Sequence, residues 1–279
     1  MLQGMLALYE HDTFLNRLLL EVGRNVLFVV IMCLHACCQK DDRTTWSTLE
    51  LVKQSIAAFG IGLASPRRIA DLVSRLVKTG YIEQRISPRD RRVRILAPTP
   101  KMLAQDQDWL ISHYKPLQVL FPNPGYAPIM QRDPAFQLAQ RMVAASLFAQ
   151  AGKLMARHPL IFRFMRREGG IMILIKLIEL AGPGDTTREV SYSDIGTRFG
   201  VSRTHVRKLM QEAEKAGLVE VTRRGGHFVR LMPKLVQAFD LFIADGMAGH
   251  DLVYNLARQA QADAGAPPMK GAGLRAATG

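Results

Sequence analysis

The sequence has few cysteines and no long apolar segment. Its three cysteines, Cys33, Cys37 and Cys38, share one short stretch, a spacing that does not suit a disulfide framework and favours a reducing compartment. The uncharged segment 25–39 is too short for a membrane span, and charged residues precede it. The first residues lack the basic start and the small-residue cleavage motif that would indicate a signal peptide. We therefore expect a cytoplasmic protein in which segment 25–39 forms a buried helix.

Signatures of the common enzyme classes are also missing. The chain contains no phosphate loop ending in Gly-Lys-Ser/Thr, no Gly-x-Gly-x-x-Gly, no His-Glu-x-x-His and no Gly-x-Ser-x-Gly. We therefore expect a protein that is not an enzyme and that holds no cofactor or metal.

Acidic residues are scarce relative to basic ones. The chain has 37 Lys/Arg against 24 Asp/Glu, which gives a formal net charge of +13. Two windows hold most of the excess: residues 65–94 have nine basic and three acidic residues, and residues 198–230 have eight and three. The charge is therefore clustered, which is typical of proteins that bind a polyanion such as nucleic acid.

The first basic window has the pattern of a helix followed by a hairpin. Apolar residues recur at the helical spacing from Ile69 to Leu76, after Ser65 as a cap and Pro66 at the first helical position. Gly80 predicts the end of the helix, and a strand, a charged turn and a returning strand follow. With a helix expected at 47–60, capped by Ser47, and another at 26–38, this predicts a winged helix-turn-helix.

The same pattern returns 137 residues later. Ser65 corresponds to Ser202, Leu72 to Leu209 and Gly80 to Gly217, so cap, core and helix end all align. A repeat of this length indicates a duplicated domain. The predicted fold is mainly α with small β-hairpin wings. It comprises an N-terminal winged helix at 1–99, a helical segment at 100–167, a C-terminal winged helix at 168–259 and a disordered tail at 260–279. Within the helical segment we expect helices at 99–117 and 133–158.

A recognition helix buries one face on its own domain and presents the other face to DNA. Arg can bond guanine bidentately, Gln can bond adenine, and the remaining cations can meet phosphates. An arginine-rich solvated face is the alternative, but two such helices, each before a basic hairpin, favour DNA. The outward positions are Arg67, Arg68, Asp71, Ser74, Arg75 and Lys78 in the first helix, and Arg203, Thr204, Arg207, Lys208 and Gln211 in the second.

The first hairpin, "SPRDRRVRIL", resembles the wing of the MarR family of bacterial winged-helix transcriptional regulators. The resemblance covers about residues 25–120, and Ser87 stands where the family has its leading Asp. It implies that Arg89 and Arg91 enter or flank the minor groove, with Arg92 beside them, and that Asp90 orients an arginine. The second wing, "RRGGHFVR", lacks this pattern but is basic. Its expected contacts, together with one on the second helix, are Arg223, Arg224, His227 and His205.

Several alternatives stay open from the sequence. Cys33 and Cys37, with or without His35, fit either a thiol sensor or small buried residues. A plasmid-type replication initiator also carries tandem winged helices, and a helical small-molecule-binding protein is a third reading. One chain could act as a pseudo-dimer on double-stranded DNA, or two chains could form a homodimer. Aromatic residues could form either the core or a pocket for a small aromatic effector, namely Trp109, Tyr114, Phe121, Tyr126, Phe136 and Phe148.

Overall fold

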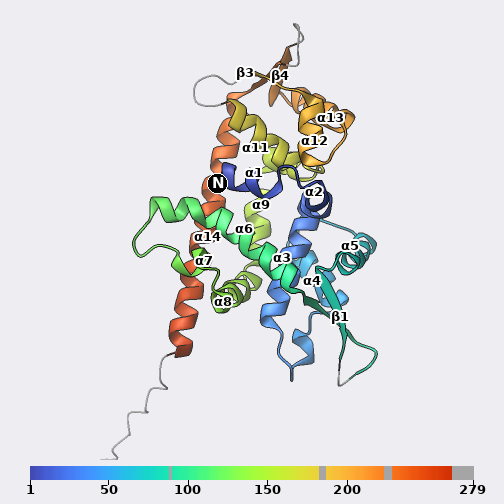
Figure 1. Ribbon diagram of the computed structural model, residues 1–279, viewed down its shortest axis with the longest axis vertical. Helices are drawn as coiled ribbons and strands as arrows, with labels where there is room; N and C mark the ends of the chain where they lie inside the picture. The colour runs from blue at the N-terminus through green and yellow to red at the C-terminus, as the bar shows by residue number, and fades with distance from the viewer. Residues whose placement is uncertain (88–89, 182–186, 223–227, 266–279) are drawn as a thin grey trace, which may run out of the picture.

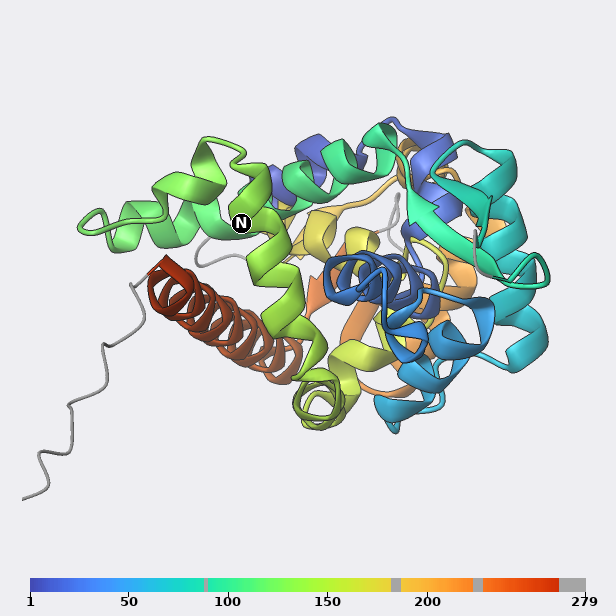
Figure 2. The same ribbon diagram turned by 90° about the horizontal axis from the view of Figure 1, so that it is seen from below.

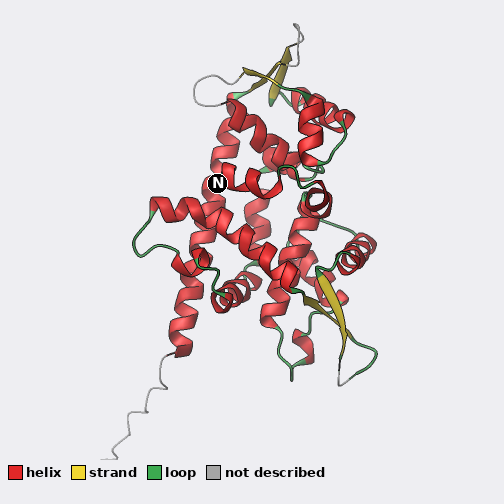
Figure 3. Ribbon diagram, in the orientation of Figure 1, coloured by secondary structure: helices red, strands yellow, loops and turns green. Residues whose placement is uncertain are grey.

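The computed structural model describes residues 1–87, 90–181, 187–222 and 228–265. Helices dominate these residues, and the strands form two small antiparallel sheets (Figure 3). The expectation of a mainly α fold with small hairpins is thus confirmed. Among the described residues, no helix combines the length and the apolar character needed to cross a membrane.

The N-terminal unit follows the predicted order. Helices α1 (Leu2–Tyr9) and α2 (Thr13–Leu19) precede α3 (Val22–Cys37), and a short 3-10 turn at Arg43–Thr45 leads into α4 (Leu49–Ala58) and α5 (Pro66–Lys78). Strands β1 (Ile82–Ile86) and β2 (Arg94–Pro98) then pair in an antiparallel hairpin. The expected cap of α4 is wrong by one residue. Thr48 accepts the capping bond from the Leu51 amide, and Ser47, whose carbonyl accepts the Leu96 amide at 2.7 Å, lies one residue before the cap.

Helix α5 forms as its sequence dictates. The Ser65 side chain accepts the Arg68 amide at 3.3 Å, and Pro66 opens the helix at a position where no amide hydrogen is needed. Gly80 ends the helix with a φ of 75°, in the left-handed region that suits glycine. The buried residues are those that the periodicity predicts, namely Ile69, Leu72, Val73 and Leu76.

The second unit repeats this order with one addition. It comprises α11 (Gly170–Ala181), β3 (Thr187–Glu189), α12 (Tyr192–Phe199), α13 (Arg203–Lys215), β4 (Val219–Thr222) and β5 (Phe228–Leu231). Ser202 caps α13 as predicted, and Val206, Leu209 and Met210 are buried. Strand β3 was not predicted. It pairs with β5 and makes a three-stranded sheet in the order β3-β5-β4.

The helical segment between the units contains α6 (Pro100–Leu120), α7 (Ala127–Met130), α8 (Pro134–Ala145), α9 (Phe148–Ala156) and α10 (Pro159–Met165). The prediction of one helix over 133–158 is wrong. The chain breaks at Ser146, whose hydroxyl bonds the Val143 carbonyl at 2.8 Å, and α9 then turns onto α4. A Cβ at Gly152 would lie 1.9 Å from the Phe59 carbonyl oxygen, so only glycine permits this approach.

Helix α14 (Pro233–Gly265) is the longest element, with 33 residues. It leaves the second sheet, runs down the left of Figure 1 and packs against α10, α6 and α8. Figure 2 shows α14 on one side and α5 with the β1–β2 hairpin on the other. The predicted disorder from residue 260 is wrong as far as Gly265, and residues 266–279 lie outside the described part.

Candidate nucleic-acid interface

Helix α5 presents basic side chains to solvent. Arg67, Arg75 and Lys78 are exposed, as is Ser74. None of the three cations has an ion pair or side-chain hydrogen bond among the described residues. Asp71 is the exposed acidic residue on this helix. The side-chain donors of Arg67, Arg75 and Lys78 are therefore available to an anionic ligand.

Helix α13 presents a similar face. Exposed side chains come from each predicted outward position, and no partner occupies the guanidinium or ammonium groups of Arg203, Arg207 and Lys208 within the described chain. Lys215, which was not predicted as a contact, is exposed in the last turn. In Figure 1, α5 and α13 lie toward the same edge of the molecule, with α2 between them. The exposed predicted residues of α13 are Arg203, Thr204, Arg207, Lys208 and Gln211.

Two predicted contact residues do not present a free side chain to solvent. Arg68 donates to the Glu21 carboxylate at 2.8 Å, and the Glu21 side chain is only 7% exposed. This ion pair ties α5 to the start of α3. His205 is half-buried, and its Nε2 is shielded from solvent with no hydrogen-bond partner in the described structure. That nitrogen therefore does not lie on the solvent-facing surface of α13.

The first hairpin carries a braced acidic residue. The Asp90 carboxylate accepts a hydrogen bond from the Arg43 guanidinium at 2.7 Å and another from the Arg92 backbone amide at 3.0 Å. The Arg92 amide and Arg43 lower the pKa of this carboxyl. The resemblance implied that Asp90 orients an arginine. Among the described residues, the guanidinium that Asp90 bonds belongs to Arg43, 47 residues earlier. No local pattern could have identified Arg43.

The first hairpin also carries exposed arginines. Arg91 and Arg92 are exposed, and Arg94 on β2 is exposed as well, without a partner in the described residues. Alternation along β2 could have identified Arg94. By contrast, Arg85 on β1 is paired with Glu83 at 2.9 Å. Arg89 lies outside the described residues.

The second hairpin is described only at its base. Arg230 on β5 forms an ion pair with Glu220, its cross-strand neighbour on β4, so this cation is neutralised. The predicted contacts Arg223, Arg224 and His227 lie outside the described residues. The described basic surface of the second unit is therefore that of α13.

Several arginines elsewhere are neutralised by protein carboxylates. Arg24 pairs with Glu168 at 2.9 Å, Arg167 with Glu212 at 2.7 Å, and Arg198 with Glu10. An ion pair of this kind leaves little net field, whereas clustered unpaired cations raise the local concentration of anions. The faces of α5 and α13 and the β1–β2 hairpin, by contrast, each carry several cations that have no carboxylate partner among the described residues.

Cys33 and Cys37 do not have the surroundings of reactive thiols. Burial raises the pKa of Cys33 to about 12, and burial followed by the charge of Cys38 raises that of Cys37. A reactive thiol needs a lowered pKa, because the thiolate is the nucleophile. Among the described residues, no group of three His, Cys, Asp or Glu side chains is placed to hold a metal ion.

Most of the aromatic residues considered for an effector pocket pack into the core. Tyr114, Tyr126 and Phe136 gather around Tyr254 of α14, with ring centroids 4.6–5.9 Å from its ring. Phe148 stacks on Phe59 at 5.0 Å. Phe121 is 57% exposed at the end of α6. Trp109 lines a small hollow with Tyr9, Asn25 and Phe28. These aromatics therefore do not line one shared cavity.

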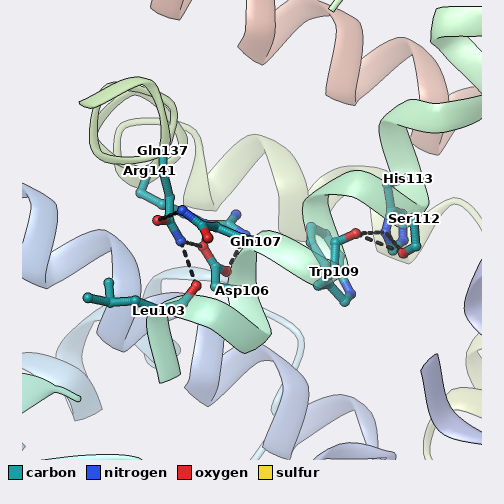
Figure 4. Close-up of polar contacts among 8 residues, drawn as sticks. All are labelled: Leu103, Asp106, Gln107, Trp109, Ser112, His113, Gln137 and Arg141. Atoms are coloured by element: carbon teal, nitrogen blue, oxygen red, sulfur yellow. Dashed lines mark hydrogen bonds and ion pairs between the residues drawn. The ribbon is translucent and has the colours of Figure 1, made fainter. Parts of the chain in front are cut away.

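A buried polar network holds the middle of the molecule together (Figure 4). Arg141 of α8 donates from Nε to Asp106 of α6 at 3.1 Å, and Gln137 donates to the same carboxylate at 2.8 Å. Burial lowers the pKa of Arg141 but Asp106 outweighs it, so the net shift is upward. The Arg141 guanidinium also lies 5.3 Å from the centroid of the Trp109 ring. Sequence reasoning missed this network, since its partners are 31–35 residues apart.

Comparison with known proteins yields no relative: no protein-family model, no curated protein and no solved structure matches this chain.

Proposed function

We propose that this protein is a sequence-specific, DNA-binding transcriptional regulator of bacterial type. In this proposal residues 1–99 and 168–259 are two winged helix-turn-helix domains, joined by the helical segment 100–167. The common order of elements supports it, since α3, α4, α5 and β1–β2 correspond to α11, α12, α13 and β4–β5. The MarR-like sequence of the first hairpin supports the assignment of a wing.

In this proposal α5 and α13 act as recognition helices. Each enters a major groove with its exposed face, where Arg75 and Arg207 are placed to bond guanine edges and Gln211 an adenine edge. Lys78 and Lys208 meet phosphates, which supplies affinity without sequence information. Arg91 and Arg92 of the wing lie at the flank, where a narrow minor groove attracts arginine.

One observation carries the proposal: both helices leave their cations exposed and unpaired, within the described chain, while their apolar faces are buried in the same register. A merely solvated surface does not require two helices with the same buried register each to expose several unpaired cations, of which Lys78 and Lys215 stand at aligned positions. It also does not require that each helix be followed by a hairpin.

The test uses the full chain and duplexes that it selects from random DNA at low salt. We expect the double variant Arg75→Ala/Arg207→Ala to bind the selected duplex at least about 25-fold more weakly, since loss of one base-contacting arginine costs about 1–3 kcal/mol. The matched control Lys115→Ala/Arg163→Ala removes two exposed cations outside the two faces and retains most of the affinity.

All four positions are exposed, so both variants should unfold at the wild-type temperature. Fluorescence anisotropy measures the affinities. Equal weakening by the two double variants, or failure of the chain to enrich any duplex, would contradict the proposal.

A further inference from the structure

The two repeated units pack against each other in this structure. A single apolar core contains Val73 of α5 and Leu209 of α13, together with Leu6, Tyr9 and Leu15 of the N-terminal helices. Helix α1 packs against α11, and α2 packs against α12. Close-packed interiors do not deform continuously, so a shared core fixes the position of one unit relative to the other.

Residues 10–24, here called the N-terminal bridge, bond directly to the second unit. The His11 amide donates to the Arg198 carbonyl at 2.9 Å, and the Gly169 amide donates to the Leu20 carbonyl at 2.8 Å. Asn16, only 1% exposed, donates to the carbonyls of Tyr9 at 2.9 Å and Arg198 at 3.4 Å. The bridge therefore holds the start of α11 and the end of α12, the helix that packs against α13.

A chain of ion pairs crosses the bridge from one exposed basic helix to the other. Arg68 of α5 pairs with Glu21 at 2.8 Å, and Arg24, whose amide bonds the Glu21 carbonyl, pairs with Glu168 at 2.9 Å. The neighbouring Arg167 holds Glu212 of α13 with three contacts of 2.7–3.1 Å. The first and last members lie on α5 and α13 themselves, so the chain links their relative positions.

The two reading faces also differ in chemistry. The exposed residues of α5 include Arg67, Ser74 and Arg75, whereas those of α13 include Thr204, Arg207 and Gln211. A symmetric homodimer reads a palindrome because its two recognition helices are identical. Two unlike helices held in one rigid body favour two unlike half-sites instead.

We propose that one chain reads one asymmetric DNA site, in which two unlike half-sites stand at a single spacing set by the N-terminal bridge. Glu10, Glu168 and Glu212 act as positioning residues. Glu10 and Glu168 join the bridge to the second unit through Arg198 and Arg24, and Glu212 joins α13 to Arg167 at the end of the helical segment. This inference rests on the proposed DNA-binding function, because it specifies the kind of site that the same two helices recognise.

The first test needs no variant. Fragments selected by the full chain are aligned to find the site, and duplexes are then made with 1, 5 or 10 extra base pairs between the half-sites. We expect each insertion to weaken binding by about 10²-fold or more, since even one mismatched base pair costs about 5- to 150-fold. Light scattering of the complex should give one chain per duplex.

Several outcomes separate the inference from the function on which it rests. Full affinity after a 10-bp insertion would overturn it, because that result means a flexible link between the helices. A palindrome occupied by two chains would overturn it as well, while the DNA-binding function would stand. Failure to enrich any duplex would overturn the function itself, and the inference with it.

A second test addresses the positioning residues. The triple variant Glu10→Gln/Glu168→Gln/Glu212→Gln removes the bridging carboxylates, and we expect its preference for the native spacing over a 1-bp longer spacing to fall about 10-fold. The control Glu50→Gln/Glu83→Gln/Glu189→Gln makes the same charge change at glutamates that have no ion-pair partner outside their own helix or strand among the described residues, and it should keep the preference.

The preference is a ratio of two affinities, so a uniform gain in affinity from the added positive charge cancels. A native spacing preference in the bridge variant, with a native unfolding temperature, would overturn the role assigned to these three glutamates.

Discussion

The substitution Asp106→Asn should destabilise the protein strongly. The side chains of Asp106 and Arg141 are 1% and 3% exposed, and the carboxylate also accepts a bond from Gln137 at 2.8 Å. Asparagine keeps the shape of the side chain but leaves the buried charge of Arg141 without a counter-charge. Breaking a buried pair in this way costs about 3–5 kcal/mol of the free energy of unfolding. For a chain of this size that corresponds to a loss of about 5–9 °C in Tm.

The matched control lies one half-turn away on the same helix. Asp108 is 39% exposed and pairs with Arg132, which is 48% exposed, so Asp108→Asn should cost at most about 1 kcal/mol. Urea titration followed by circular dichroism, with a thermal scan, measures both variants against wild type. If Asp106→Asn falls within about 1 kcal/mol of Asp108→Asn, the reasoning about the buried network is refuted.

Two further predictions concern the reading surface and the pH dependence. Arg207→Ala should cost about 1–3 kcal/mol on the selected site and relax base preference nearby, whereas Arg91→Ala should weaken binding more evenly or lose discrimination for narrow A·T-rich grooves. Identical profiles of the two variants over a panel of duplexes would contradict this division. Burial lowers the pKa of His113 to about 4, so its contribution to stability is complete above pH 6.5 and is lost as the pH falls toward 4. That loss amounts to about 3 kcal/mol. His113→Phe should flatten the pH dependence measured by urea unfolding, and an unchanged slope would contradict the assignment.

The sequence predicts the elements whose signals are local. The caps at Ser65 and Ser202, the apolar periodicity of α5 and α13 and the glycines after them all lie within about fifteen residues, and the structure has these helices as expected. The strands β1, β2, β4 and β5 follow from the same reasoning. The predicted contacts at exposed helix positions depend on the same periodicity, which places them opposite the buried face.

What the sequence could not predict depends on contacts between distant residues. The break at Ser146 places Gly152 against Phe59, and nothing within residues 133–158 indicates that approach. Arg68 has the same periodicity as Arg67, yet it is engaged by Glu21, 47 residues earlier. Helix α14 extends past residue 260 without an apolar pattern there to indicate it. Strand β3 has only three residues and depends on β5 for its pairing.

The salt dependence of binding tests the central claim most directly, namely that the unpaired cations of α5, α13 and the first hairpin bind the DNA backbone. If about six to ten phosphates are neutralised, a plot of log affinity against log salt should have a slope of about −5 to −9, and affinity should fall about 10³–10⁵-fold between 50 and 200 mM salt. Removing Lys78 or Lys208 should make the slope shallower by about one each. A flat salt response of the wild-type chain on its selected duplex would contradict the account. The cations available to phosphates are the eight that the proposal does not assign to base edges, namely Arg67, Lys78, Arg91, Arg92, Arg94, Arg203, Lys208 and Lys215.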